Sequence, residues 1–435
     1  MRTIFYSVST GYFARNLLRT GVIERLLALP DIRIVIISPG YDNENFVKEF
    51  SYSDRIFIEK MYPADRAYDF NDKIIWKAWM LGHKYCFFQV VYKVFLKMQI
   101  KTRYYDKYIR HYSGIFDKYA PCLVIGASPG INSRMDIPIF AIAQKRKIKT
   151  LALIHSWDNI AKRKGPMWIR PDVLGVWNEL QKQDGIKANF YDQKDVRIVG
   201  PVHFDMYWKK ETFRSKDKFF EEMGLDPAKK LISVIATAPG LVKNYYIVDI
   251  LLEALKMDKF MVPVQLLCRP TPSIDPRRND KEFGKYYNNP DIVMDTQVQY
   301  SSSLGWDPDK KQLSHFANLV KYTDVQVSIV STATVEAVIL DKPVVNVAFS
   351  TVEPDAFQKY IIDSVFSNHF QPVLDYRATY IAKNPDDLIH GINNYLRDSS
   401  IHCHERAELK KVLVYKADGN SVDRVSQLIL ELISQ

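Results

Sequence analysis

The amino-acid sequence predicts two α/β domains in tandem, each built on a parallel sheet with helices on both faces. The chain has 435 residues, which is too long for one ordinary core, because domains usually hold about 100–200 residues. Short apolar runs alternate with helical patterns, as expected for strands that are buried on both faces of a sheet. The alternation stops near residue 201 and restarts near residue 231, so two such units are expected.

The first domain is predicted to cover residues 1–202. Its expected strands are 3–8, 32–38, 55–59, 122–127, 150–155, 173–177 and 196–200. A helix should follow the first strand from Gly11 to about Leu29, and another should run from the fourth strand to Lys147. The segment 70–118 has a helical pattern and no strand, so it is predicted to be a helical insertion in this domain.

Residues 203–216 show little strand or helix pattern and are predicted to be a linker. The second domain should cover 217–435, with C-terminal helices from about residue 384. Its expected strands are 231–237, 262–268, 291–294, 325–330 and 343–348, and its expected helices include 243–257, 311–322 and 332–340. Ligands of open parallel sheets bind at the carboxyl ends of strands, where the strand order reverses. We therefore expect a ligand cleft between two facing domains.

Composition limits the class of protein. Apolar residues make up 47% and charged residues 25%, the balance of a soluble globular chain. The four cysteines are far apart, which disfavours disulfides and cysteine zinc sites and fits a reducing compartment. No signal peptide is evident, and no run approaches the roughly 18 apolar residues of a spanning helix. We expect a cytoplasmic protein without a membrane span.

The segment 73–111 concentrates positive charge. It contains nine Lys or Arg residues against one acidic residue, Asp106, hence a net charge of +8 within a chain total of +10, and it carries ten interleaved aromatic residues. Such a pattern suits an anionic membrane surface, here the inner face of the plasma membrane, whereas nucleic acid is the less favoured anion and is not expected as a partner. The alternative is amphipathic helices whose aromatic residues are core and whose lysines are solvated.

A cluster of hydroxyl side chains follows the strand that ends at Val330. Ser331, Thr332 and Thr334 lie at the expected start of a helix, where backbone N–H groups and the helix dipole favour anions. Glu336 lies one turn further and could accept hydrogen bonds from a ribose diol. Ordinary helix capping is the alternative, with no ligand involved.

The stretch STATVEAVILDKPVVNVAF, residues 331–349, resembles the nucleotide-binding segment of the GT-B glycosyltransferase superfamily. That superfamily includes CDP-glycerol glycerophosphotransferases and non-hydrolysing UDP-N-acetylglucosamine 2-epimerases. The resemblance implies two facing Rossmann-like domains, with Ser331, Thr332 and Thr334 at the donor phosphates and Glu336 at the ribose. QLLCRPTP, residues 265–272, resembles the family's strand followed by Arg/Lys-Pro-His-Pro. It implies that Arg269 faces phosphate, although Thr271 replaces the usual histidine.

A second polar cluster, HSWDNIAKRKGP at residues 155–166, directly follows a strand. The region 156–205 resembles bacterial glycosyltransferase-like proteins of the same superfamily, and a histidine in the comparable loop of the glycerophosphotransferases is a proposed base. His155 and Asp158 are therefore the candidate catalytic residues, with Asn159 and Lys162 as substrate ligands. The alternative is that Asp158 and Asn159 only cap a turn.

Gly11 lies in the turn after the first strand and is the third candidate site. A glycine there allows the backbone to approach a substrate closely, although a plain strand–helix turn is equally consistent with the sequence. The chain contains no phosphate-loop motif, HExxH, GxSxG or paired zinc spacing. We expect no metal and no cofactor beyond a nucleotide-sugar substrate.

The resemblance implies a metal-independent glycosyltransferase, and we expect it to act in bacterial surface polysaccharide synthesis. It would move a sugar from a nucleotide-activated donor to a glycan or lipid-linked acceptor. The alternatives are a UDP-sugar 2-epimerase, for which Asp136 and Asp158 are the few available carboxylates, or a glycerophosphate-type transferase. A non-catalytic scaffold that binds membrane surfaces is an alternative of another class.

Overall fold

The protein forms two compact α/β units, as predicted. The computed structural model describes residues 1–62, 70–99, 103–127, 134–161, 164–237, 242–272, 276–297, 300–301, 303–366 and 368–434. Unit 1 comprises Met1–Asp205, Ser301–Asp307 and Asn420–Gln435, and unit 2 comprises Met206–Tyr300 and Pro308–Gly419. Each unit contains one large sheet of parallel strands, which confirms the predicted fold class.

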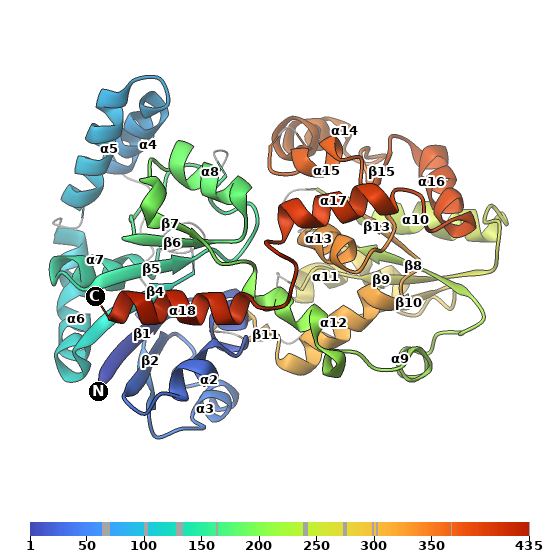
Figure 1. The fold of residues 1–435 in the computed structure, drawn as a ribbon. Coiled ribbons are helices and arrows are strands. Elements are labelled where there is room, and N and C mark those ends of the chain that lie inside the picture. The colour runs from blue at the N-terminus through green and yellow to red at the C-terminus, as the bar shows by residue number, and fades with distance from the viewer. Residues whose placement is uncertain are drawn as a thin grey trace. The chain divides into compact units, whose positions relative to one another are not determined.

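The sheet of unit 1 has seven strands in the order β3-β2-β1-β4-β5-β6-β7, and all neighbours pair in parallel (Figure 1). The strands are β1 (Arg2–Ser7), β2 (Ile32–Ser38), β3 (Ile56–Lys60), β4 (Pro121–Gly126), β5 (Lys149–Leu153), β6 (Val173–Val176) and β7 (Val196–Ile198). The strand order reverses between β1 and β4, because β1 pairs with β2 on one side and with β4 on the other.

Helices cover both faces of this sheet because its strands are apolar on both sides. Ile4 and Tyr6 of β1 belong to a core with η1, α2, α3 and α18, whereas Phe5 belongs to a core with α6 and α7. The elements are α1 (Gly11–Phe13), η1 (Ala14–Leu18), α2 (Val22–Leu27), α3 (Glu44–Phe50), α6 (Arg103–Tyr119), α7 (Ile137–Lys145), α8 (Glu179–Lys187), η3 (Gln193–Asp195) and α18 (Ser421–Ile433).

The basic segment is helical, as predicted. The segment 73–111 lies within α4 (Phe70–Gly82), α5 (Cys86–Gln99) and α6, and the links between them. Helices α4 and α5 pair with each other, and Trp79 and Tyr92 bury their rings beside Phe190. Among the described residues, no helix combines the length and the apolar character that crossing a membrane requires.

The sheet of unit 2 has six parallel strands in the order β10-β9-β8-β13-β14-β15, which reverses between β8 and β13. The strands are β8 (Lys230–Ile235), β9 (Val264–Arg269), β10 (Ile292–Met294), β13 (Val325–Ser328), β14 (Val344–Val347) and β15 (Tyr380–Ala382). Apolar residues of α9 (Lys216–Met223) and α12 (Lys310–Tyr322) join one core with β8 and β9. Helix α10 (Tyr245–Lys256) packs on β9, and α16 (Pro385–Arg397) packs on β14.

The remaining elements are short or peripheral. They are η4 (Val202–Trp208), η5 (Lys210–Thr212), α11 (Pro276–Phe283), η6 (Gly284–Tyr286), β11 (Tyr300–Ser301), β12 (Gly305–Trp306), α13 (Thr332–Ile339), α14 (Pro354–Phe357), η7 (Gln358–Phe366), α15 (Gln371–Asp375) and α17 (Cys403–Leu413). The expected linker at 203–216 therefore contains the helical turns η4 and η5.

The unit boundaries differ from the expected domains. Helix α18 was predicted to belong to the second domain, but Val425 and Ile429 are fully buried in the core of unit 1. The segment Ser301–Asp307 also belongs to unit 1, where the Trp306 ring contacts Tyr12. Both segments return to the first unit because their apolar side chains pack there, a contact across hundreds of residues that local patterns do not encode.

Candidate functional site

Both sheets have a topological switch point, the place where the strand order reverses. Ligands of open parallel sheets bind in the crevice outside the carboxyl ends of the strands at this point. In unit 1 the switch point lies after β1 and β4, and in unit 2 it lies after β8 and β13. The polar side chains that follow these four strands are therefore the first candidates for a binding or catalytic role.

In unit 2, hydroxyl groups gather at the switch point. Ser331 caps α13, and its Oγ accepts a hydrogen bond from the Ala333 N–H at 3.2 Å. Thr237 follows β8 and donates its hydroxyl to the Val330 carbonyl at 2.7 Å. This bond ties together the chain segments that leave the two strands. Ser331 and Thr332 are both partly exposed, so the N-terminus of α13 is open to a ligand.

Helices α10 and α13 both begin at this edge, and among the described residues a carboxylate caps the start of α10 but not that of α13. The Glu282 carboxylate accepts hydrogen bonds from the backbone N–H groups of Asn244 and Tyr245, at the start of α10. The start of α13 has the Ser331 hydroxyl in that place instead. A hydroxyl that accepts a capping bond can still donate its own proton. The α13 N-terminus is therefore the better place for an anionic ligand.

Thr334 does not join this hydroxyl group, contrary to the prediction. Its side chain is fully buried, and its Oγ1 lies 3.5 Å from Ser328 Oγ and 3.4 Å from Asn346 Nδ2. The first turn of α13 places position 334 toward the sheet, so Thr334 belongs to a polar network in the core. Ser331 and Thr332 remain as the hydroxyl groups that can meet a phosphate.

Glu336 lies on the next turn of α13 and is almost completely buried. Its Oε2 accepts a hydrogen bond from the Tyr207 hydroxyl at 2.6 Å. The carboxylate is thus held in one orientation within unit 2, beside the helix start that could take a phosphate. This arrangement is consistent with the ribose role that the resemblance implies.

Arg269 does lie at the carboxyl end of β9, but it does not face outward to a phosphate as predicted. Its guanidinium is buried and forms an ion pair with Asp295, whose carboxylate also lies 3.2 Å from the His315 ring. Burial alone would raise the pKa of Asp295, but Arg269 and His315 stabilise the carboxylate and lower it overall. A buried charge needs its partner, so Arg269 serves this internal network first.

In unit 1 the switch point holds a carboxylate. Asp136 immediately precedes α7, has no exposed surface, and accepts hydrogen bonds from Ser7, the last residue of β1, and from Ser9 at 3.1 Å. Burial raises the pKa of Asp136 to about 7, although the two serine hydroxyls oppose the shift. This group therefore changes protonation near neutral pH, which is the property of a general acid or base.

His155 follows β5 and is buried against the Phe13 ring, with ring centroids 4.8 Å apart. Burial lowers the pKa of His155 to about 3, and the neighbouring Arg15 adds to the shift while Asp158 opposes it. The imidazole is consequently neutral at pH 7 and is a weak base. Of the two buried groups, Asp136 has the pKa that lies closer to neutral pH.

The other predicted residues of this loop are engaged within it. Asp158 forms an ion pair with Lys164 at 2.8 Å and accepts a hydrogen bond from the Ser156 hydroxyl. Asn159 is buried, and its Oδ1 accepts from the Ser156 N–H at 3.0 Å. Both contacts match the turn-capping alternative. Lys162 lies outside the described residues.

Gly11 is a packing glycine rather than a substrate contact. Its N–H donates to the Leu304 carbonyl at 2.9 Å, and a side-chain carbon at position 11 would overlap the backbone of Trp306 and Asp307. The close approach that the sequence predicted is therefore real, but the partner is the segment Ser301–Asp307. Nearby, Arg19 forms ion pairs with Glu49 and Asp307, which fixes the same segment.

Two Rossmann-like units with candidate sites at their switch points define the GT-B fold. Comparison with solved structures shows the same fold, in agreement with the fold that the resemblance implied. The epimerase of Neisseria meningitidis, a UDP-GlcNAc 2-epimerase bound to UDP-GlcNAc, is 12% identical over 99% of both chains, with a TM-score of 0.57.

Two further structures carry other activities on the same fold. A glycosyltransferase from Rickettsia africae is 12% identical over 100% of this chain and 99% of its own, with a TM-score of 0.53. The wall teichoic acid polymerase TagF is 11% identical over 100% of this chain and 89% of its own, with a TM-score of 0.56. No protein-family model matches the chain, and no curated protein matches it either.

Sequence reasoning did not identify the contacts that build these sites. Asp136 was named only as an available carboxylate for the epimerase alternative, because its contact with Ser7 joins residues 129 positions apart. Asp295 and His315 are likewise brought to Arg269 only by the fold. Thr237 was included in an expected strand, and its position after β8, the strand at the switch point, was the one local signal that could have identified it.

Proposed function

We propose that this protein is a metal-independent glycosyltransferase of bacterial surface polysaccharide synthesis. It transfers a sugar from a nucleotide-activated donor to a glycan or lipid-linked acceptor. The observation that carries the proposal is the open N-terminus of α13, capped by Ser331 at the switch point of unit 2, with the oriented Glu336 one turn away. Structures of this fold that bind UDP-GlcNAc or act as glycosyltransferases support it as analogy.

The donor's phosphates would lie against the first turn of α13. Backbone N–H groups and the hydroxyls of Ser331 and Thr332 would stabilise the negative charge that develops on the departing nucleoside diphosphate. In many enzymes such preorganised hydrogen-bond donors make the largest single contribution to the rate enhancement. They stabilise the charge of the transition state without a metal ion. Glu336, oriented by Tyr207, would accept hydrogen bonds from the ribose hydroxyls.

The acceptor would bind at the switch point of unit 1. A transfer that inverts the sugar needs a base for the acceptor hydroxyl. We assign that role to Asp136, because its pKa of about 7 lets it hold or release a proton at neutral pH. His155 remains as a neutral hydrogen-bonding group at the same sheet edge.

Calorimetry with UDP-, GDP-, CMP- and CDP-linked donors tests the proposal. Binding of one nucleotide class, followed by release of that nucleotide only when a glycan acceptor is added, is the expected result. The failure of every nucleotide to bind would contradict it.

A UDP-sugar 2-epimerase is the second candidate function, since structures with that activity share the fold. An epimerase converts a UDP-sugar without any acceptor, so incubation of the donor alone followed by NMR separates the two. A glycerophosphate-type transferase would instead release CMP from a CDP-linked donor. A scaffold without catalytic activity would show neither reaction.

We further propose that the enzyme works in the cytoplasm, at the inner face of the plasma membrane. The α4–α5 hairpin exposes large apolar side chains beside lysines of the segment 73–111, and Phe87 is 70% exposed. The exposed apolar residues are Trp76, Met80, Tyr85, Phe87, Val90 and Val94. Apolar side chains flanked by lysines match an anionic bilayer, where each lysine contributes about 1 kcal/mol.

Vesicle sedimentation tests this partner. The protein should pellet with vesicles that contain phosphatidylglycerol, and high salt should release it. The variant Phe87→Ser/Val90→Ser should pellet less, while donor binding in solution stays unchanged. Equal pelleting with neutral and anionic vesicles would contradict the proposal.

A further inference from the structure

A large pocket lies at the amino edge of the unit 1 sheet, opposite the edge that carries the switch point. Lys149 begins β5, Asp172 immediately precedes β6, and Asp195 immediately precedes β7, and all three line the pocket. Because the strands are parallel, their amino ends meet at one edge. The cavity volume is about 1250 Å³, somewhat above the roughly 300–1000 Å³ of common small-molecule pockets. None of the predicted catalytic or nucleotide-binding residues lines it.

Positive charge dominates the pocket wall. Six cationic side chains line it, against three carboxylates. The cations are Lys93, Lys97, Lys145, Lys147, Lys149 and Arg170. Among the described residues, none of the six lies within ion-pair distance of a carboxylate. Asp172 is engaged elsewhere, since it accepts the N–H and the hydroxyl of Thr150 at 2.8 and 2.7 Å.

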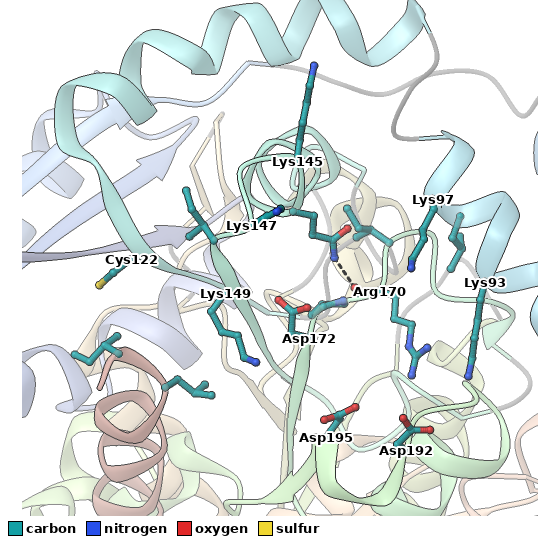
Figure 2. A pocket seen from close by; sticks show the side chains of 17 residues that line it. Lys93, Lys97, Cys122, Lys145, Lys147, Lys149, Arg170, Asp172, Asp192 and Asp195 are labelled. Atoms are coloured by element: carbon teal, nitrogen blue, oxygen red, sulfur yellow. Dashed lines mark hydrogen bonds between the residues drawn. The ribbon is translucent and has the colours of Figure 1, made fainter. Parts of the chain in front are cut away.

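Lys93 and Arg170 both line this wall (Figure 2), and the contacts of each are specific. The Arg170 guanidinium packs over the Tyr191 ring at 4.2 Å, and its backbone carbonyl accepts a hydrogen bond from Gln144 at 2.5 Å. Burial lowers the pKa of Lys93, and the nearby charge of Arg170 lowers it further, while Asp192 opposes the shift. Because these two cations repel each other, an anion bound between them would stabilise both charges.

Apart from Gln144 and Cys122, the rest of the wall is apolar. It is formed by Leu96, Ile148, Ile169, Pro171, Leu432 and Ile433. Leu96 is contributed by α5 and Leu432 by α18, so two helices far apart in the sequence meet at this wall. Cationic groups beside an extended apolar surface suit an amphiphile with a phosphate head and a hydrocarbon chain. A free phosphate would leave the apolar surface unused.

The position of α5 favours a lipid over other anions. This helix supplies Lys93, Leu96 and Lys97 to the pocket and exposes Val90 and Val94 to solvent. One helix thus contributes both to the pocket and to the surface that we propose for membrane docking. A ligand that is itself a membrane component fits this continuity.

We propose that the amino-edge pocket of unit 1 is a second binding site, which takes the phosphate head and the adjoining hydrocarbon chain of an anionic lipid. The phosphate lies at Lys93 and Arg170, and the chain lies along Leu96 and Ile433. The site is separate from the nucleotide site of unit 2, and its binding can be measured without a donor or a vesicle.

Calorimetry with dihexanoyl phosphatidic acid, kept below its micelle concentration, tests the site on the full chain. Phosphatidic acid should bind at least tenfold more tightly than glycerol 3-phosphate or inorganic phosphate. Dihexanoyl phosphatidylcholine should bind at least tenfold more weakly than phosphatidic acid. If inorganic phosphate or polyphosphate binds as tightly as phosphatidic acid, the pocket is a site for free anions and the proposal is overturned.

Variants locate the binding on the pocket. Arg170→Gln and, separately, Lys93→Gln/Lys149→Gln should each weaken phosphatidic acid at least tenfold. The double variant keeps the test valid if loss of the Arg170–Tyr191 contact unfolds the protein. Ile433→Asn should weaken phosphatidic acid and leave inorganic phosphate unchanged.

A charge-matched control, Lys209→Gln/Lys229→Gln, removes two exposed lysines of unit 2 and should change binding less than twofold. If this control weakens binding as much as Lys93→Gln/Lys149→Gln does, the effect is one of net charge and the proposal fails. Donor binding should be unchanged in every variant, so this site and the proposed nucleotide site can fail independently.

Discussion

The switch points of the two units carry different chemistry on the same strand order. In unit 1 the polar groups after the strands are the buried carboxylate of Asp136 and two serine hydroxyls. In unit 2 they are the Ser331 hydroxyl and the backbone N–H groups at the start of α13. Glu336 lies on the next turn of the helix and is bound by Tyr207. The first arrangement can hold a proton near neutral pH, and the second can hold an anion. A shared topology therefore places a candidate site at the same edge of each sheet, while the side chains found there differ in chemistry.

The largest effect is expected from Asp136→Asn, which removes the titrating group and keeps the shape of the side chain. The rate of transfer should fall by about 10²–10⁴-fold, the range for loss of a general base. In the wild type the rate should rise with pH through about 7, because the ionised form is the base. Steady-state assays from pH 5 to 9 measure both effects. A wild-type rate that is flat over this range, or a fully active variant, would remove Asp136 from catalysis.

The pKa of Asp136 also predicts a stability change with a defined sign. Its folded pKa of about 7 lies above the unfolded value, so its contribution to stability is fully present at low pH. That contribution should decline as the pH rises from about 4 through 7, by as much as about 4 kcal/mol for a shift of this size. Urea unfolding of wild type and Asp136→Asn should show a stability difference that depends on pH in this window. Parallel pH profiles for the two proteins would contradict the shifted pKa.

Gly11→Ala tests whether the turn after β1 packs against protein or against substrate. The added methyl overlaps the backbone of Trp306, so we expect a loss of about 1–3 kcal/mol in the free energy of unfolding. The matched control is Gly114→Ala in α6, which meets no atoms within 4 Å and should stabilise by roughly 0.5–1 kcal/mol. If Gly11→Ala retains stability but weakens acceptor binding, the substrate interpretation returns.

Ser331→Ala should cause the smallest change in stability and in nucleotide affinity, and it tests one side chain of the proposed phosphate site. Loss of the cap should cost about 1 kcal/mol of stability, and loss of the phosphate contact should weaken nucleotide binding by a similar amount. Ser215→Ala is the control, because Ser215 caps α9 in the same unit. Calorimetry and thermal unfolding should show similar stability losses in both variants and weaker nucleotide binding only in Ser331→Ala. Equal nucleotide affinity in the two variants would make Ser331 a cap alone.

Much of the fold could be predicted because buried parallel strands have a strong local signal. Each expected strand is present with its ends shifted by no more than two residues, whereas the three-residue strand β15 was not predicted. The start of α13 was identified because hydroxyl residues at a strand end are also local. The pairing of Arg269 with Asp295, the burial of Asp136 and the contact of Gly11 with Trp306 all join distant segments. Sequence patterns place such residues on elements, but packing decides what they touch.

We propose that nucleotide binding belongs to the switch point of unit 2 and proton transfer to that of unit 1. Calorimetric titration of the best-binding nucleotide diphosphate into wild type, Glu336→Ala and Asp136→Asn tests it directly. Loss of a charged hydrogen bond should weaken nucleotide binding to Glu336→Ala by about 1–3 kcal/mol, while Asp136→Asn should bind as the wild type does. Unchanged affinity in Glu336→Ala, or weakened affinity in Asp136→Asn alone, would contradict this division of the two sites.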